Sequence, residues 1–272
     1  MPNMNDAAGR HAFRGLALGL AALTLAGCAA GGLATAPPAV SANISSLTQV
    51  VEANPNDPGP LNVRGTAYGE AGAYEAALRD FSQAIALDPN FHQAYANRAL
   101  VLRRLDRPAE AIADYDRALS IAPTYDPAFV GRGNVYRQQG QTTLALADFQ
   151  RAIQISADNP RAFHNRGLIY QSQNNHVLAI EDFAAAIALN PVAPEPYVAR
   201  GNSYLAQNDP KSALDDFNAA TRLRQNYAEA WEGTGRAQEA LGQTANAKSS
   251  YSRALGYDRN LQAARDGLRR IR

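Results

Sequence analysis

A period of 34 residues organises most of this 272-residue chain. An aromatic residue recurs at that interval six times, and alanines stand at fixed distances before and after it. The aromatic series is Phe81, Tyr115, Phe149, Phe183, Phe217 and Tyr251. No insertion or deletion interrupts the period from residue 58 to residue 261. A repeat of this length indicates one small structural unit that is copied along the chain and buries its apolar face against its neighbours.

Each unit is expected to contain two helices. Apolar positions recur within it every three and four residues, which is the helical period. A small residue lies in the first half, and the aromatic residue between alanines lies in the second half, so the two helices are expected to approach closely. Turn residues such as Gly72 and Asn174 separate the halves, and Asp209 is expected to cap the helix that Pro210 begins.

This pattern resembles the tetratricopeptide repeat (TPR). The match covers six units, numbered here in chain order, which are 58–91, 92–125, 126–159, 160–193, 194–227 and 228–261. The resemblance implies an all-α fold, a right-handed α-solenoid of stacked helix-turn-helix units. Residues 42–57 are expected to form an N-terminal capping helix, and residues 262–272 a C-terminal capping helix.

Residues 1–27 are expected to be an export signal. Basic residues precede an apolar run of about eleven residues, which is shorter than the roughly 20 that span a bilayer. The run ends in Leu25-Ala26-Gly27-Cys28, which resembles the lipobox of bacterial lipoproteins. That resemblance implies a signal peptide over residues 1–27, a lipidated Cys28, and a flexible tether over residues 28–41. A plain secretory signal with an unmodified cysteine, or a buried N-terminal helix, is the alternative.

The composition excludes several classes of protein. The chain has 26 basic and 25 acidic residues, so it lacks the basic surface of most nucleic-acid-binding proteins, and no nucleic acid is expected as a partner. One cysteine forms neither an intramolecular disulfide nor a cysteine-rich zinc site. No nucleophile lies at a recognisable spacing from a general base, so we expect no enzyme activity, no cofactor and no metal.

Two charged columns accompany the repeat in units one to five. The arginines are Arg64, Arg98, Arg132, Arg166 and Arg200, and the aspartates are Asp80, Asp114, Asp148, Asp182 and Asp216. In unit six both columns are lost together, as Thr234 and Ser250. Because the losses coincide, we expect the two columns to form internal ion pairs that fix repeat against repeat. A row of cations for an anionic ligand is the alternative.

The TPR resemblance places the first helices along a concave groove that binds other proteins or peptides. The candidate partner-binding residues are Gln93, Asn97, Arg103, Arg104, Asn134, Arg137, Arg161, His164, Asn165 and Gln171. This basic centre is expected to suit carboxylates or a mixed-charge peptide, with a merely solubilising role for its arginines as the alternative. An acidic C-terminal end, formed by Glu195, Glu229, Glu232 and Glu239, is expected to suit a basic segment. The TPR clamp for a C-terminal carboxylate is not expected, because Val130, Glu195 and Ala199 stand where it has cations.

The resemblance to bacterial TPR lipoproteins implies a function at the cell envelope. We expect a lipid-anchored periplasmic scaffold at the outer membrane that binds protein partners in envelope or peptidoglycan maintenance. An assembly factor for pilus, secretin or other outer-membrane complexes is the alternative. A regulator of an envelope enzyme, with a small ligand in the basic centre, is a third reading. The identity of the partner and homodimer formation stay open.

Overall fold

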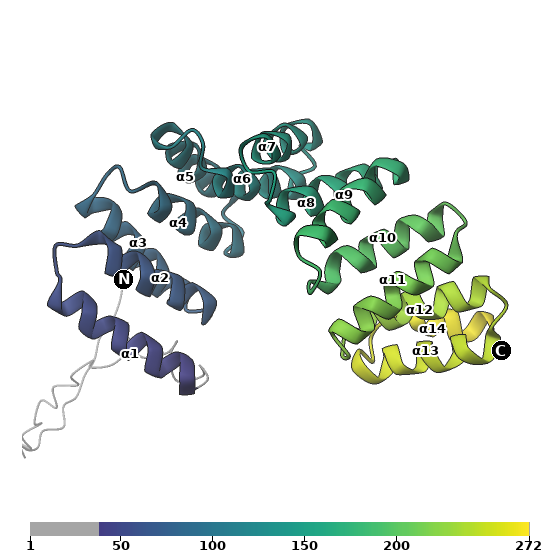
Figure 1. Cartoon of the computed structure of the whole chain (residues 1–272). Helices are drawn as coiled ribbons and strands as arrows, with labels where there is room; N and C mark the ends of the chain where they lie inside the picture. Colours follow the sequence, from purple (N-terminus) through teal and green to yellow (C-terminus); the bar gives the residue numbers. More distant parts are fainter. Residues whose placement is uncertain (1–37, 272) are drawn as a thin grey trace, which may run out of the picture.

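Residues 38–271 of the computed structural model form fourteen α-helices and no strand. The helices follow one another along a curved array (Figure 1). Their bounds are α1 (Pro38–Ala53), α2 (Pro58–Glu70), α3 (Tyr74–Leu87), α4 (His92–Arg104), α5 (Pro108–Ile121), α6 (Asp126–Gln138), α7 (Thr142–Ile155), α8 (Pro160–Ser172), α9 (His176–Leu189), α10 (Pro194–Ala206), α11 (Pro210–Leu223), α12 (Ala228–Ala240), α13 (Thr244–Tyr257) and α14 (Gln262–Arg270). The all-α solenoid expected from the repeat is confirmed. The proposed signal peptide and Cys28 lie outside the described residues.

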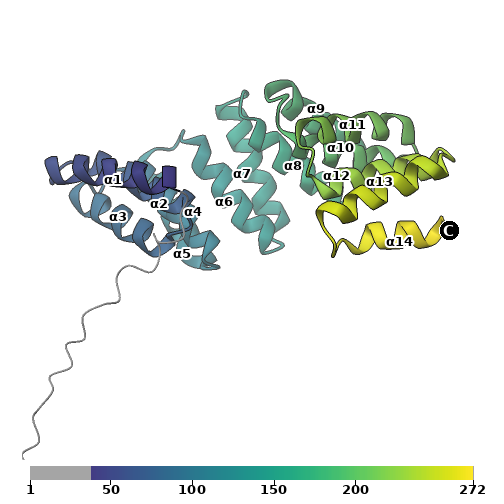
Figure 2. The same ribbon diagram turned by 90° about the horizontal axis from the view of Figure 1, so that it is seen from below.

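The helices form pairs that stack along the array, as Figure 2 also shows from below. The first helix of each pair packs on the second, and the second packs on the first helix of the next pair. Consecutive first helices, such as α4 and α6, also contact each other. Within residues 38–271 the backbones of consecutive second helices, such as α5 and α7, make no such contact. The array therefore curves toward the first helices, which lie on its concave side.

An aromatic side chain fills the centre of each pair. The six aromatic residues of the repeat are at most 2% exposed, and the alanines beside them are fully buried. In unit three, a Cβ added to Gly133 would lie 2.8 Å from a ring carbon of Phe149, so no larger side chain fits there without movement. The small residue in the first helix therefore permits the close approach that the sequence predicts.

The turns inside the pairs use residues that tolerate positive φ. Those residues are Gly72, Asp106, Gly140, Asn174, Asn208 and Gly242. Glycine adopts this region without steric cost, and Asn and Asp adopt it more readily than other residues. After the last Asn, the Oδ1 atom of Asp209 accepts a hydrogen bond of 3.1 Å from the N–H of Ser212. The expected cap of α11 is confirmed, with Pro210 at the first helical position.

The arginine and aspartate columns pair, as expected. In units one to five the guanidinium donates two hydrogen bonds of 2.7 to 2.9 Å to the aspartate sixteen residues later. These aspartates are 5 to 8% exposed. Both partners belong to the same unit, so each pair holds the first helix of a unit on its second helix. The expectation that these pairs join one repeat to the next was wrong.

The same arginines make a second set of contacts between units. In units one to four a third guanidinium nitrogen bonds to a side chain of the preceding second helix or of α1, for example Arg98 to Ser82 at 3.1 Å. In unit six the pair is replaced by neutral contacts. There Thr234 donates to the Ala230 carbonyl at 2.9 Å, and Ser250 donates to the Gln238 side chain at 2.7 Å.

The helix at the N-terminal end differs from the expected boundary. α1 begins at Pro38, before the expected start at residue 42, and ends at Ala53. Residues 38–41, which were expected in the tether, belong to this helix. Pro38 suits its first position, because proline lacks the N–H that would have no helical partner there. In the part of the chain that the structure describes, no helix is both long and apolar enough to cross a membrane.

Candidate partner-binding groove

All ten predicted binding residues lie on three neighbouring first helices, on the concave side. α4 carries Gln93, Asn97, Arg103 and Arg104, α6 carries Asn134 and Arg137, and α8 carries Arg161, His164, Asn165 and Gln171. They do not form one cluster. The structure divides them between two pockets, a central pair of arginines, and amides that already have partners within the array, while Gln93 lies half-buried on the first turn of α4.

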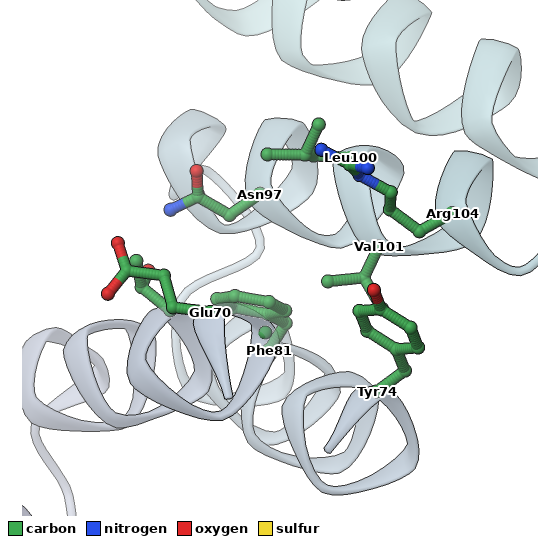
Figure 3. Close-up of a pocket in the computed structure, with 9 residues that line it drawn as sticks. Glu70, Tyr74, Phe81, Asn97, Leu100, Val101 and Arg104 are labelled. Carbon is green, nitrogen blue, oxygen red and sulfur yellow. The ribbon is translucent and has the colours of Figure 1, made fainter. Parts of the chain in front are cut away.

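A pocket of about 380 Å³ lies between α2, α3 and α4 (Figure 3). We call it the α2–α4 pocket. Leu100 and Arg104 of α4 lie across from Glu70 of α2 and Tyr74 of α3, and Phe81 forms part of the floor. Leu100 is 44% exposed, and Arg104 makes no ion pair with any described residue. The pocket therefore offers an apolar surface beside a free cation, which suits an apolar side chain next to an acidic one.

Two arginines on the concave side of units two and three form what we call the central arginines, Arg103 and Arg137. Each is half-buried, and the Nε atom of each is buried without a hydrogen-bond partner among residues 38–271. Burial lowers the pKa of Arg137, and the neighbouring charge of Arg103 lowers it further. Since an arginine pKa still lies far above 7, both side chains stay charged. The charge of Arg103 therefore acts on Arg137, and neither arginine forms an ion pair with a carboxylate of residues 38–271.

A buried tyrosine hydroxyl, that of Tyr115, lies beside Arg103. Burial raises the pKa of Tyr115 to about 12, against the opposing effect of the nearby Arg103 charge. A Cβ added to Gly131 would lie 2.5 Å from the Tyr115 hydroxyl oxygen, so the absence of a side chain there makes room for the hydroxyl. Arg103, Arg137 and Tyr115 thus bring two guanidinium groups and one hydroxyl to this part of the groove.

A second pocket, of about 220 Å³, lies between α8 and α10. Arg161, His164 and Asn165 line it from α8, and Glu195 lines it from α10. The His164 ring packs at 5.6 Å from the Phe183 ring, and its Nδ1 atom is buried with no hydrogen-bond partner in the described part of the chain. Burial lowers the pKa of His164, and Glu195 opposes this effect. The α8–α10 pocket is therefore mixed in charge.

Most of the predicted amides already have partners within the array. Gln171 donates to the Ala199 carbonyl at 2.7 Å and to the Ser203 hydroxyl at 2.8 Å, which ties unit four to unit five. Asn97 donates to the Asn62 side chain at 3.0 Å. Asn134 and Asn165 donate to carbonyl groups of their own helices, at 3.0 and 2.8 Å. Each of these four amides therefore makes at least one hydrogen bond within the array.

The acidic C-terminal end is largely neutralised, in contrast to the expectation from sequence. Three of its four carboxylates form ion pairs, which are Glu195 with Arg224 (2.6 Å), Glu232 with Arg236 (2.9 Å) and Glu239 with Arg270 (3.0 Å). Glu232 is also buried, and burial raises its pKa. The partner Arg224 follows the end of α11, and Arg270 belongs to α14, so the end does not present the free negative surface that a basic segment would need.

No metal site is evident among residues 38–271. No three or more His, Cys, Asp and Glu side chains are grouped there in a way that holds a metal ion. The groove instead offers pockets, unpaired cations and hydrogen-bond donors, which are elements of a binding surface.

Models of one repeat family match the chain along most of the array. A model described as TPR repeat matches residues 133–174, and models described as tetratricopeptide repeat match residues 62–126, 160–191 and 198–266. No curated protein matches the chain by sequence.

Solved structures with low sequence identity share the fold. A chain in the crystal structure of the APC/C hetero-tetramer Cut9–Hcn1 matches with a TM-score of 0.76 and 20% identity, over 86% of this chain and 46% of that one. This chain thus spans less than half the length of that relative. PilF of Pseudomonas aeruginosa matches with a TM-score of 0.69 and 17% identity, over 85% of this chain and 99% of that one. YrrB, described as a TPR protein with an unusual peptide-binding site, matches with a TM-score of 0.50 and 22% identity, over 69% of this chain and 96% of that one.

Proposed function

Because the chain belongs to the tetratricopeptide repeat family, we propose that it is a scaffold that binds other proteins or peptides along its concave face. Members of this family and fold are generally scaffolds without catalytic activity. The observation that carries the proposal is the contrast in charge pairing. The array pairs the arginines of its repeat column internally, yet the concave side of units two and three presents Arg103, Arg104 and Arg137 without ion pairs.

The scaffold is proposed to be lipid-anchored in the periplasm, with partners in envelope or peptidoglycan maintenance. The support is the sequence Leu25-Ala26-Gly27-Cys28 after a short apolar run. Ala29, in place of an aspartate, favours the outer membrane over the inner one. Each CH₂ of an acyl chain that enters the bilayer contributes about 0.8 kcal/mol, so two or more chains hold a protein firmly. An anchored array then raises the effective concentration of its partners near the membrane.

The anchor is tested by fractionation of cells that express Cys28→Ser. We expect the wild-type protein in the membrane fraction and the variant in the soluble periplasm, because the serine hydroxyl cannot take the thioether-linked lipid. Ala30→Ser is the matched control, because it changes a neighbouring residue without removing the sulfur, and it should stay with the membrane. A Cys28→Ser variant that remains membrane-bound would refute lipidation.

The alternative function is assembly of pilus, secretin or other outer-membrane complexes. It rests on the resemblance to TPR lipoproteins of that kind, and the similarity to the PilF structure over nearly its whole length shows a shared fold. Affinity capture from envelope extracts separates the candidates. Recovery of peptidoglycan hydrolases supports the scaffold, recovery of secretin without hydrolases supports the assembly factor, and a retained small molecule in native mass spectrometry supports an enzyme regulator.

The same capture tests the groove itself. We expect the combined variant Arg103→Ala, Arg104→Ala and Arg137→Ala to lose the partner that the wild-type chain recovers. If both recover the same proteins in equal amounts, the basic centre is not the binding surface, and the proposed site is wrong.

A further inference from the structure

The central arginines differ from every other arginine that the structure describes. Arginines that are half-buried elsewhere in residues 38–271 form ion pairs with Asp or Glu, and arginines without an ion pair are exposed. Arg103 and Arg137 are half-buried and unpaired. A half-buried charge loses part of its hydration, and no carboxylate of residues 38–271 offsets that loss for these two arginines. Two positive charges in this part of the groove therefore lack a counter-ion.

A matched site four repeats further on shows what a complete arrangement contains. Arg103 and Tyr115 occupy the same repeat positions as Glu239 and Tyr251. The Tyr251 hydroxyl donates to Glu239 at 2.6 Å, and Arg270 donates to both carboxylate oxygens at 3.0 Å. A carboxylate, a guanidinium and a tyrosine hydroxyl thus satisfy one another at the C-terminal end.

At the central site an arginine stands where the C-terminal site has its glutamate, and no carboxylate of the described residues forms an ion pair with it. Arg103 replaces the glutamate, and the position of Arg270 is taken by Asn134, whose amide donates to the Val130 carbonyl at 3.0 Å. A guanidinium and a tyrosine hydroxyl remain, and Arg137 adds a second guanidinium. The missing member is a carboxylate.

We propose that Arg103 and Arg137 bind a carboxylate of an acidic segment in the partner polypeptide, with the Tyr115 hydroxyl beside it. This inference rests on the proposed function and names the chemistry that the groove recognises. A guanidinium forms two parallel hydrogen bonds with a carboxylate, and such charge-assisted bonds are about twice as strong as neutral ones. The bound carboxylate also relieves the repulsion between the two cations.

A polypeptide fits the surroundings better than an inorganic anion. The α2–α4 pocket shares α4 with the central arginines and is lined by the exposed Leu100 and the half-buried Tyr74 beside Arg104. An apolar side chain close in sequence to the acidic residue has a surface to cover there. The expected ligand is therefore an acidic segment that also carries an apolar residue.

The experiment measures binding of labelled peptides to the full chain by fluorescence anisotropy. One peptide places a leucine before adjacent glutamates, the second replaces the glutamates with glutamine, and the third carries phosphoserine in their place. The variants are Arg103→Gln and Arg137→Gln. Arg79→Gln is the matched control, because Arg79 is exposed on α3, a second helix, and its loss removes the same net charge.

We expect the glutamate peptide to bind the wild-type chain and each central variant to bind it roughly 10-fold or more weakly, since a hydrogen bond to a charged group contributes about 1.5–3 kcal/mol. Arg79→Gln should bind like the wild type, and the glutamine peptide should bind weakly to all chains. The central variants should unfold at the same temperature as the wild type or higher, because no internal ion pair is lost. Having two central variants keeps the test valid if one of them fails to fold.

The inference is overturned if the wild-type chain does not bind the glutamate peptide, if Arg79→Gln weakens binding as much as the central variants, or if the glutamine peptide binds equally well. Tighter binding of the phosphoserine peptide through the same arginines would also overturn it, because the site would then recognise phosphate. Absence of peptide binding together with intact capture of a partner from extracts would leave the proposed function standing. Loss of both would remove the function as well.

Discussion

Removal of Arg200 tests how strongly the internal ion pairs hold the two helices of a unit together. Arg200 donates two hydrogen bonds of 2.8 Å to Asp216, which is 5% exposed. Arg200→Ala leaves this carboxylate without its counter-ion, and loss of one partner of a buried pair costs about 3–5 kcal/mol. Because the Arg200 side chain is 19% exposed, water reaches part of the site. We therefore expect the free energy of unfolding to fall by about 3 kcal/mol, which lowers the melting temperature by about 6–12 °C.

A double-mutant cycle separates the pair from other effects of the substitution. Arg200→Thr with Asp216→Ser copies the neutral side chains that unit six has at Thr234 and Ser250, so no buried charge is left unpaired. The cycle also needs the two single variants Arg200→Thr and Asp216→Ser. We expect the double variant to be more stable than Arg200→Thr alone, with a coupling energy of about 1–3 kcal/mol. The measurement is urea unfolding followed by circular dichroism at neutral pH, and Arg79→Ala is the exposed control, with a change within about 0.5 kcal/mol. Additive losses in the cycle would show that the two side chains do not stabilise the unit as a pair.

Three further predictions concern packing and pH. Gly233→Ala places a Cβ 2.3 Å from a ring carbon of Phe217, so we expect a loss of about 1–3 kcal/mol in urea unfolding. Gly256→Ala meets nothing within 4 Å in α13 and should raise stability by about 0.5–1 kcal/mol, so equal effects of the two substitutions would contradict the packing argument. Burial lowers the pKa of His164, so the folded chain resists protonation and its stability should fall as pH drops below about 6.5, and this fall should be smaller in His164→Gln. Burial raises the pKa of Tyr115 to about 12, so the folded chain holds a proton that the unfolded chain loses above about pH 10. Stability should therefore fall as pH rises from about 10 to 12, and identical unfolding curves for wild type and Tyr115→Phe across that window would contradict the assigned burial effect.

The repeat made most of the fold predictable from sequence. A period of 34 places a small residue such as Gly133 against an aromatic residue such as Phe149, and the structure brings these two within van der Waals contact. The pairing of the arginine and aspartate columns was also predictable, because Thr234 and Ser250 replace both charges in the same unit. Features that recur in every unit leave a signal that can be compared along the chain.

The groove was less predictable because its contacts do not follow the period. Arg224 donates to Glu195 from 29 residues further along, at the end of α11 in the same unit, and no column of the repeat predicts this pair. The apolar part of the α2–α4 pocket also escaped prediction, since Tyr74 and Leu100 come from different helices. Which side chains from different helices meet depends on rotamer and helix angle, and these are set by packing.

Because each ion pair lies inside a single unit, an array of this kind can gain or lose repeats without breaking its ion pairs. Arginine and aspartate are sixteen residues apart within every period of the first five units. An insertion or deletion of one whole period, at any phase, leaves each arginine with an aspartate at the same spacing. Duplication during evolution therefore lengthens the concave surface without stranding a buried charge, and natural selection is free to diversify the positions that face the partner.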